Sequence, residues 1–115
     1  CRLADTRDPS GPFGGPPLSP GIPRTFVLAS RCGIPPTAKA LSLNVTVDQP
    51  ASAGHVTVYP GGTPLPSTST LNYSAGQTRA NNAILALGAA QDLTAQCAQA
   101  SGAVHLILDV NGYFE

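Results

Sequence analysis

At 115 residues the chain fits one domain, with no room for a second hydrophobic core. Six basic residues balance six acidic ones, and because they are scattered, no basic stripe exists to follow nucleic acid or an anionic membrane. No apolar run approaches the roughly 20 residues that span a bilayer, so we expect neither nucleic-acid binding nor membrane insertion.

The chain begins with Cys1 and a strand-like segment at residues 2–7. No signal peptide precedes it, and we interpret the chain as a mature or excised piece. Asp5 and Arg7 are two residues apart, so they share one face of this strand. They form either a ligand-binding pair or a structural ion pair, in which the guanidinium of Arg7 holds neighbouring carbonyls or carboxylates such as Asp109. We favour the structural interpretation, because ion pairs of this kind are common outside functional sites.

Residues 8–23 carry six prolines and four glycines. The fixed φ angles of proline make this segment extended and stiff. One interpretation is a long ordered loop that Phe13 pins to the core, and the other is an arm for binding or assembly. We favour the loop, because long structureless loops are rare in compact domains.

Period-two alternation is the clearest structural signal in the rest of the chain. Apolar and polar residues alternate strictly at 41–48, and the same pattern occurs at 55–59 and 104–111. A helix would need apolar residues at i, i+3 and i+4, which these windows lack. Weaker strand candidates, separated by Gly- and Pro-containing turns, lie at residues 2–7, 24–29, 68–73, 82–87 and 93–98.

About eight short strands at this spacing predict one all-β domain over residues 1–115, an antiparallel β-sandwich. A jelly roll or closed barrel is the alternative architecture. The only helix-like window, residues 77–87, is short and contains Asn81 and Asn82, which disfavour a stable helix.

Three cysteines, Cys1, Cys32 and Cys97, are an odd number without CxxC spacing, so a zinc ribbon or thioredoxin motif is excluded. One disulfide with one remaining thiol is the simplest arrangement. Three reduced, buried cysteines in a cytosolic protein are the alternative.

A series of motifs in order along the chain resembles a known kind of domain. The series is CRLADTR at the start, then CGIP, LNVTV, GQTRAN and finally DVNGYF. It resembles an extracellular accessory domain of secreted bacterial proteins, of actinobacterial, myxobacterial or acidobacterial type. Such domains are often repeated or attached to other extracellular domains, and the motifs themselves establish no activity.

The resemblance implies a secreted protein with a Cys1–Cys32 bridge, because similar domains often pair a Cys before the DTR element with the Cys of CGIP. Cys97 would then be unpaired. It shares an alternation face with Leu93 and Ala95, so we expect a buried thiol rather than an interchain bridge.

Metal and catalytic motifs are incomplete. Residues 109–112 begin like an EF-hand loop, but the chain ends before the late Glu such a loop needs, leaving only calcium shared with another loop. His55 and His105 could meet across strands, yet two nitrogens do not make a metal site. No nucleophile elbow and no paired carboxylates are evident. We therefore predict no enzyme, no metal and no cofactor.

The leading functional hypothesis is a non-catalytic module that binds cell-surface or environmental polysaccharide. A neutral sheet face rich in Ser, Thr, Asn and Gln can hydrogen-bond sugar hydroxyls. The candidate ligand-binding residues are Tyr59, Tyr73, Asn44 and Asn81, whereas the Phe residues are expected in the core. The alternative is a structural subunit or repeat of an extracellular fibre or surface layer, in which copies join through strand edges and the Pro-rich arm.

Overall fold

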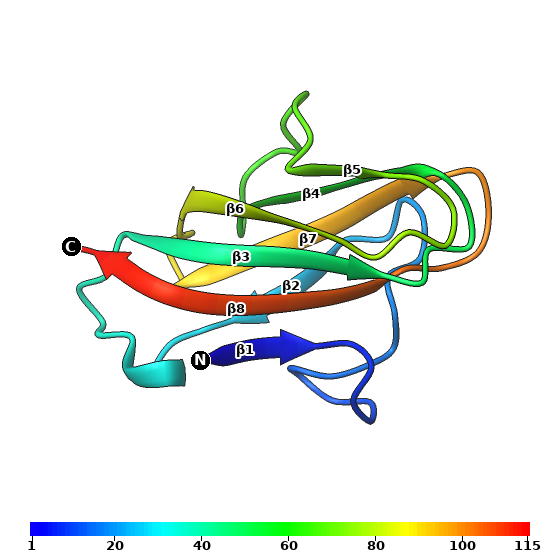
Figure 1. The fold of residues 1–115 in the computed structure, drawn as a ribbon. Helices are drawn as coiled ribbons and strands as arrows, with labels where there is room; N and C mark the ends of the chain where they lie inside the picture. Colours follow the sequence, from blue (N-terminus) through cyan, green and yellow to red (C-terminus); the bar gives the residue numbers. More distant parts are fainter.

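Eight β-strands and one short 3₁₀ turn make up the fold, and the computed structural model describes all residues from 1 to 115 (Figure 1). The turn spans Arg31–Gly33. None of the structure's helical segments is long and apolar enough to cross a membrane. The strands are β1 (Arg2–Asp5), β2 (Arg24–Val27), β3 (Ala40–Asp48), β4 (Gly54–Pro60), β5 (Leu71–Tyr73), β6 (Arg79–Ala86), β7 (Asp92–Gln99) and β8 (His105–Phe114).

Two antiparallel sheets pack face to face. One has the strand order β1-β8-β3-β6 and forms the nearer layer in Figure 1, and the other, β2-β7-β4-β5, lies behind it. Each strand predicted from the sequence is present, and the predicted β-sandwich is confirmed. Because the strands form two separate sheets, the fold is not a closed barrel.

The alternation of β3 explains how the sheets pack. Leu41, Leu43, Val45 and Val47 are fully buried, while the residues between them point to the other side of the sheet. Burial of each such aliphatic side chain contributes about 1.5–3 kcal/mol. The other sheet supplies the facing half of the core with Phe26, Val56, Val58, Leu71, Leu93 and Ala95.

β8 is longer than the alternation indicates, and it contains a bulge. The expected strand ends at residue 111, whereas β8 continues to Phe114. Val110 pairs with Leu43 and Gly112 with Ser42, so Asn111 is an extra residue in the ladder. A bulge of this kind reverses the face to which later residues point. A strict two-residue rhythm would direct Phe114 toward the core, but the bulge turns it outward, opposite Ala40.

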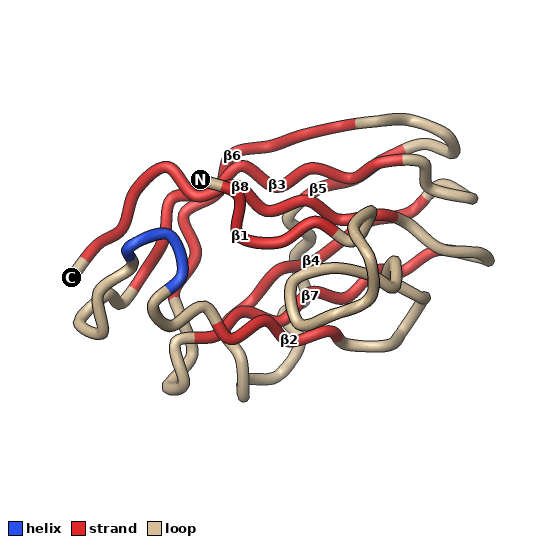
Figure 2. The backbone as a smooth tube through the Cα atoms, turned by 90° about the horizontal axis from the view of Figure 1, so that it is seen from below, coloured by secondary structure: helices blue, strands red, loops and turns tan.

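Residues 8–23 form an ordered loop that closes one side of the sandwich. The amide of Asp5 donates to the carbonyl of Phe13 at 2.9 Å. The guanidinium of Arg24 on β2 donates to the carbonyls of Gly11 and Gly14 at 2.7 and 2.8 Å. Figure 2 looks onto this side, where the loop crosses between β1 and β2. The polar groups of the segment are therefore used within the molecule, which does not fit a free arm.

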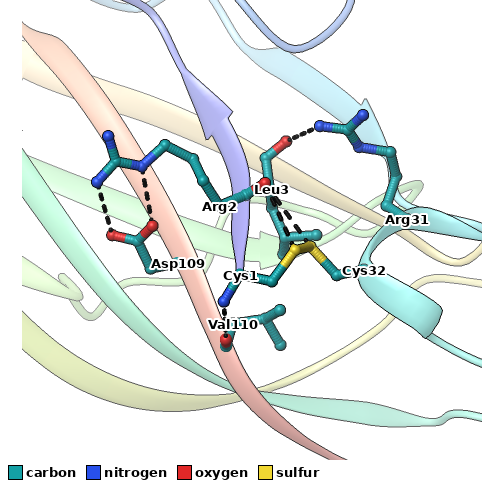
Figure 3. Close-up of a disulfide and its surroundings, with 7 residues drawn as sticks. All are labelled: Cys1, Arg2, Leu3, Arg31, Cys32, Asp109 and Val110. Carbon is teal, nitrogen blue, oxygen red and sulfur yellow. Dashed lines mark hydrogen bonds and ion pairs between the residues drawn. A yellow bond between two sulfur atoms is a disulfide. The ribbon is translucent and has the colours of Figure 1, made fainter.

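A disulfide joins the start of β1 to the 3₁₀ turn. Cys1 and Cys32 are bonded across a sequence separation of 31, with their Cα atoms 5.9 Å apart (Figure 3). Beside it, Arg31 donates to the carbonyl of Leu3 at 2.8 Å. The pairing implied by the resemblance is thus confirmed. Cys97 is a free, buried cysteine, and burial raises the pKa of its thiol.

Candidate functional site

The β1-β8-β3-β6 sheet has one side in the core and an opposite side, called here the outer face. The register places Asn44 between Asp109 and Asn82, and Ser42 between Gly112 and Ile84. Residues directly opposite each other in a ladder share a face. The outer face consists of Arg2, Asp5, Ala40, Ser42, Asn44, Thr46, Asp48, Ala80, Asn82, Ile84, Ala86, His105, Ile107, Asp109, Gly112 and Phe114.

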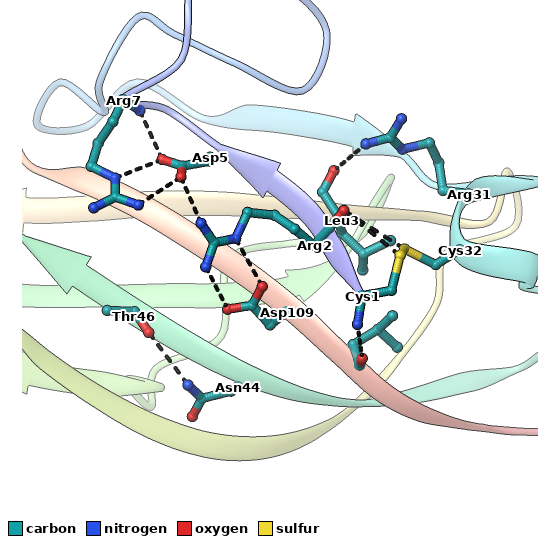
Figure 4. A network of polar contacts seen from close by, with 11 residues as sticks. Cys1, Arg2, Leu3, Asp5, Arg7, Arg31, Cys32, Asn44, Thr46 and Asp109 are labelled. Atoms are coloured by element: carbon teal, nitrogen blue, oxygen red, sulfur yellow. Dashed lines mark hydrogen bonds and ion pairs between the residues drawn. A yellow bond between two sulfur atoms is a disulfide. The ribbon is translucent and has the colours of Figure 1, made fainter.

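Charged residues gather along the β1 edge of the outer face (Figure 4). Arg2 bridges two carboxylates, donating to Asp109 at 2.9 Å and to Asp5 at 3.1 Å. Arg7 holds Asp5 through its side chain, at 2.8 and 3.0 Å, and through its backbone amide. Asp109 therefore forms an ion pair with Arg2 and not with Arg7. Besides Asp5, Arg7 contacts the carboxylate of Asp48 at 3.9 Å.

Asp5 is the buried centre of this network. Only 3% of the residue is exposed, and it receives hydrogen bonds from both arginines. These bonds, above all the one from the Arg7 side chain, lower the pKa of Asp5 from 3.8 to about 2. Its own contacts with the two arginines satisfy the carboxylate, so the arrangement acts as a clamp that holds β1 to β8.

The middle of the outer face is uncharged and polar. Ser42, Asn44 and Thr46 follow one another along β3, and Asn82 lies beside Asn44 on β6. The Asn44 side chain donates to Thr46 at 3.4 Å, which is a weak bond. Ser42 and Asn82 make no side-chain hydrogen bond within the chain. These donors and acceptors are consequently free to bind a partner.

Apolar and small residues occupy the end of the outer face next to this polar centre. Phe114 is 48% exposed and Ile84 is 67% exposed. Between them the register places only Ala40, Ser42, Ala86 and Gly112. The result is a shallow shelf with one aromatic ring, so the expectation that the Phe residues lie in the core is wrong for Phe114.

The structure separates the four residues expected to bind ligand. Tyr59 and Tyr73 belong to the other sheet and are only 6% and 5% exposed. Their hydroxyls pair with Gln96 and Gln99, and burial raises the pKa of Tyr73 to about 12. Neither ring is available to stack on a sugar. Asn81 lies on β6 and donates to the carbonyl of Thr70, so only Asn44 lies within the neutral centre.

The two histidines do not meet. His55 lies on β4 and His105 on β8, which belong to different sheets, so they are not cross-strand neighbours. His105 is within 3.1 Å of the Thr6 hydroxyl. No group of three or more His, Cys, Asp or Glu side chains is arranged to hold a metal ion.

The site residues predicted from the sequence do not include five residues of the outer face: Arg2, Ser42, Thr46, Asn82 and Phe114. Asn82 falls inside a predicted strand, and its position opposite Asn44 follows only from the pairing of β3 with β6. Arg2 and Asp109 are joined by the pairing of the two ends of the chain. No local pattern signals either contact.

The fold and this face define the class of the protein as an all-β sandwich, closed on one side by a disulfide and a Pro-rich loop and open on the outer face of one sheet. Comparison with family models, curated proteins and solved structures found no match.

Proposed function

We propose that the chain is a non-catalytic, extracellular accessory module that binds neutral polysaccharide through the outer face of its β1-β8-β3-β6 sheet. The observation that carries this proposal is the uncharged row formed by Ser42, Asn44, Thr46 and Asn82. A sugar polymer offers a series of hydroxyl groups, each a donor and an acceptor, and amide and hydroxyl side chains can match them.

The surroundings of the row support this ligand class. Phe114 provides one exposed ring beside the row, and an aromatic ring can pack against the apolar face of a sugar. The nearby carboxylates are occupied, because Asp5 and Asp109 pair with Arg2. They are thus committed to structure, which favours binding over acid–base catalysis. A disulfide is typical of proteins in oxidising compartments, which fits an extracellular location.

Affinity electrophoresis through gels that contain neutral polysaccharides, together with pull-down on insoluble ones, tests the proposal. Asn44→Ala combined with Asn82→Ala removes two side chains that can each form hydrogen bonds of about 1 kcal/mol. We expect affinity to fall about tenfold or more. Phe114→Ala should also weaken retention.

The matched control is Asn72→Ala, because Asn72 is an exposed asparagine on β5 of the opposite sheet. Its loss should leave retention unchanged. Equal retention of the double variant and the native chain would reject the outer face as the binding site. An equal loss in Asn72→Ala would reject it as well.

A further inference from the structure

β6 is the longest edge strand of the sandwich. Four strands lie at sheet edges: β1 and β6 in one sheet, β2 and β5 in the other. β1 and β2 have four residues each and β5 has three, whereas β6 has eight. β6 pairs with β3 alone, so its second edge has no strand partner.

The features that normally protect a long edge are few along β6, whose one charged residue, Arg79, stands at its start. Such edges carry charged side chains, prolines or bulges, or lie beneath a loop. Residues 80–86 contain no charged residue, no Pro and no Gly, and the register between β3 and β6 runs without a shift. The Pro-rich loop closes the β1 and β2 side. On the β6 side, residues 66–70 lie against the inner side of β6, where Asn81 donates to the carbonyl of Thr70, and a groove of about 400 Å³ remains between this loop, β4 and β6.

The hydrogen-bond pattern shows which residues of β6 face outward. The amide of Leu87, directly after β6, donates to the carbonyl of Lys39, directly before β3, at 2.8 Å. In an antiparallel ladder, successive residues alternate between facing the partner strand and facing away. The odd-numbered residues of β6 therefore bond to β3. Ala80, Asn82, Ile84 and Ala86 direct their backbone N–H and C=O groups toward the free edge.

We propose that β6 is a strand-addition site whose partner is β6 of a second copy of this chain, paired antiparallel about a two-fold axis at Ala83. Outward-facing residues must pair with outward-facing residues, and this register pairs all of them. Asn82 lies opposite Ile84, and Ala80 lies opposite Ala86. The exchange forms about eight backbone hydrogen bonds.

Charge does not oppose this pairing. The only charged residue of β6, Arg79, lies beyond the last pair in this register, opposite Leu87 of the partner copy, so the two copies of Arg79 do not meet. The formal net charge of the chain is +0 at pH 7. Two copies therefore approach without the repulsion that keeps strongly charged proteins apart.

The contact closes on itself, because the same strand serves both partners. The other edges are short, and β1 and β2 are flanked by the ordered loop, so the geometry gives a dimer and not a fibre. The dimer joins the two β1-β8-β3-β6 sheets into one. Because even-numbered residues pair with even-numbered ones, both outer faces lie on the same side of the joined sheet.

Sedimentation equilibrium over a range of concentrations tests for the dimer, with an expected mass of about twice 11.6 kDa. Ile84→Lys places a charge in the new ladder, and Ala80→Pro removes one outward N–H while leaving the bonds to β3 intact. Both should give a monomer. Ile22→Lys is the matched control, since Ile22 is 62% exposed and lies just before β2, an edge strand of the other sheet; it should remain a dimer.

Ala83→Cys tests the register. The two Ala83 residues face each other in a non-hydrogen-bonded pair with Cα atoms about 4.5 Å apart, within the range of a disulfide. Oxidation should cross-link this variant. In Asn81→Cys the two cysteines are about 13 Å apart along the strands, and no cross-link should form. A native chain that stays monomeric, a dimer that survives both edge variants, or cross-linking at position 81 instead of 83 would each overturn the proposal. None of these outcomes depends on polysaccharide binding.

Discussion

Asp5 shows how a single carboxylate can hold the first strand in place. It is 3% exposed and takes hydrogen bonds from Arg2 and Arg7. Its folded-state pKa of about 2 lies below the ordinary value of 3.8. The ionised form therefore stabilises the fold at pH values above about 4, and this contribution is lost as the pH falls through about 2.

We expect Asp5→Asn to reduce the free energy of unfolding at neutral pH by about 1–3 kcal/mol, because hydrogen bonds to a charged acceptor are lost. The variant should also lose much of the decrease in melting temperature that the native chain shows between about pH 4 and pH 2. Thermal unfolding followed by circular dichroism measures both effects. Asp8→Asn, at an exposed loop residue without a salt bridge, is the control and should keep the native pH profile. An unchanged acid profile in Asp5→Asn would contradict this role.

The disulfide acts at the scale of elements, because it fastens β1 to the turn that leads toward β3 (Figure 3). β1 has only four residues, and a strand this short needs support beyond its ladder with β8. The bond closes a loop in the unfolded chain and so reduces its conformational entropy, which raises the free energy of the unfolded state.

Replacing both Cys1 and Cys32 with Ser should lower the free energy of unfolding by about 3–4 kcal/mol, the value for a loop of this length. Urea unfolding of the oxidised chain, the reduced chain and the double variant provides the measurement. The reduced chain and the variant should agree, and reductant should not affect the variant. A difference of less than about 1 kcal/mol from the oxidised chain would mean that β1 holds without the bridge.

The strands could be predicted because each has a local sequence pattern. In β3 the alternation of Leu41, Leu43, Val45 and Val47 with polar residues indicates both a strand and its buried face. No such local pattern indicates the bulge in β8. It consists of Asn111, which is left without a pairing partner because Val110 pairs with Leu43 and Gly112 with Ser42. The Phe residues are expected in the core, and the bulge instead places Phe114 on the outer face.

The candidate site was less predictable than the strands, because it depends on pairing between distant segments. Asn44 was identified for its polar character on a strand, but its neighbour Asn82 follows from the pairing of β3 with β6. Tyr59 was chosen for its aromatic ring, and the packing of the second sheet then buries it. Composition and alternation describe what a strand can offer, whereas only the order of strands in a sheet determines which side chains act together.

At the scale of the whole molecule, the outer face and the free edge of β6 belong to the same sheet, so they affect one another if both proposals hold. A dimer through β6 presents two outer faces on one side. The second face then binds a polymer already held by the first, and this intramolecular step strengthens binding without a new contact.

The expected consequence is a difference between long and short ligands. The disulfide-linked Ala83→Cys dimer should bind an immobilised polysaccharide about a hundredfold more tightly than the monomeric Ala80→Pro variant. Both should bind a short oligosaccharide with equal affinity per chain, since neither substitution replaces a residue of the polar row or Phe114. Biolayer interferometry on the polymer and calorimetry with the oligosaccharide supply the two affinities. Equal binding of the polymer by dimer and monomer would show that the two faces do not act together, because a polymer that spans both must be released from both before it dissociates.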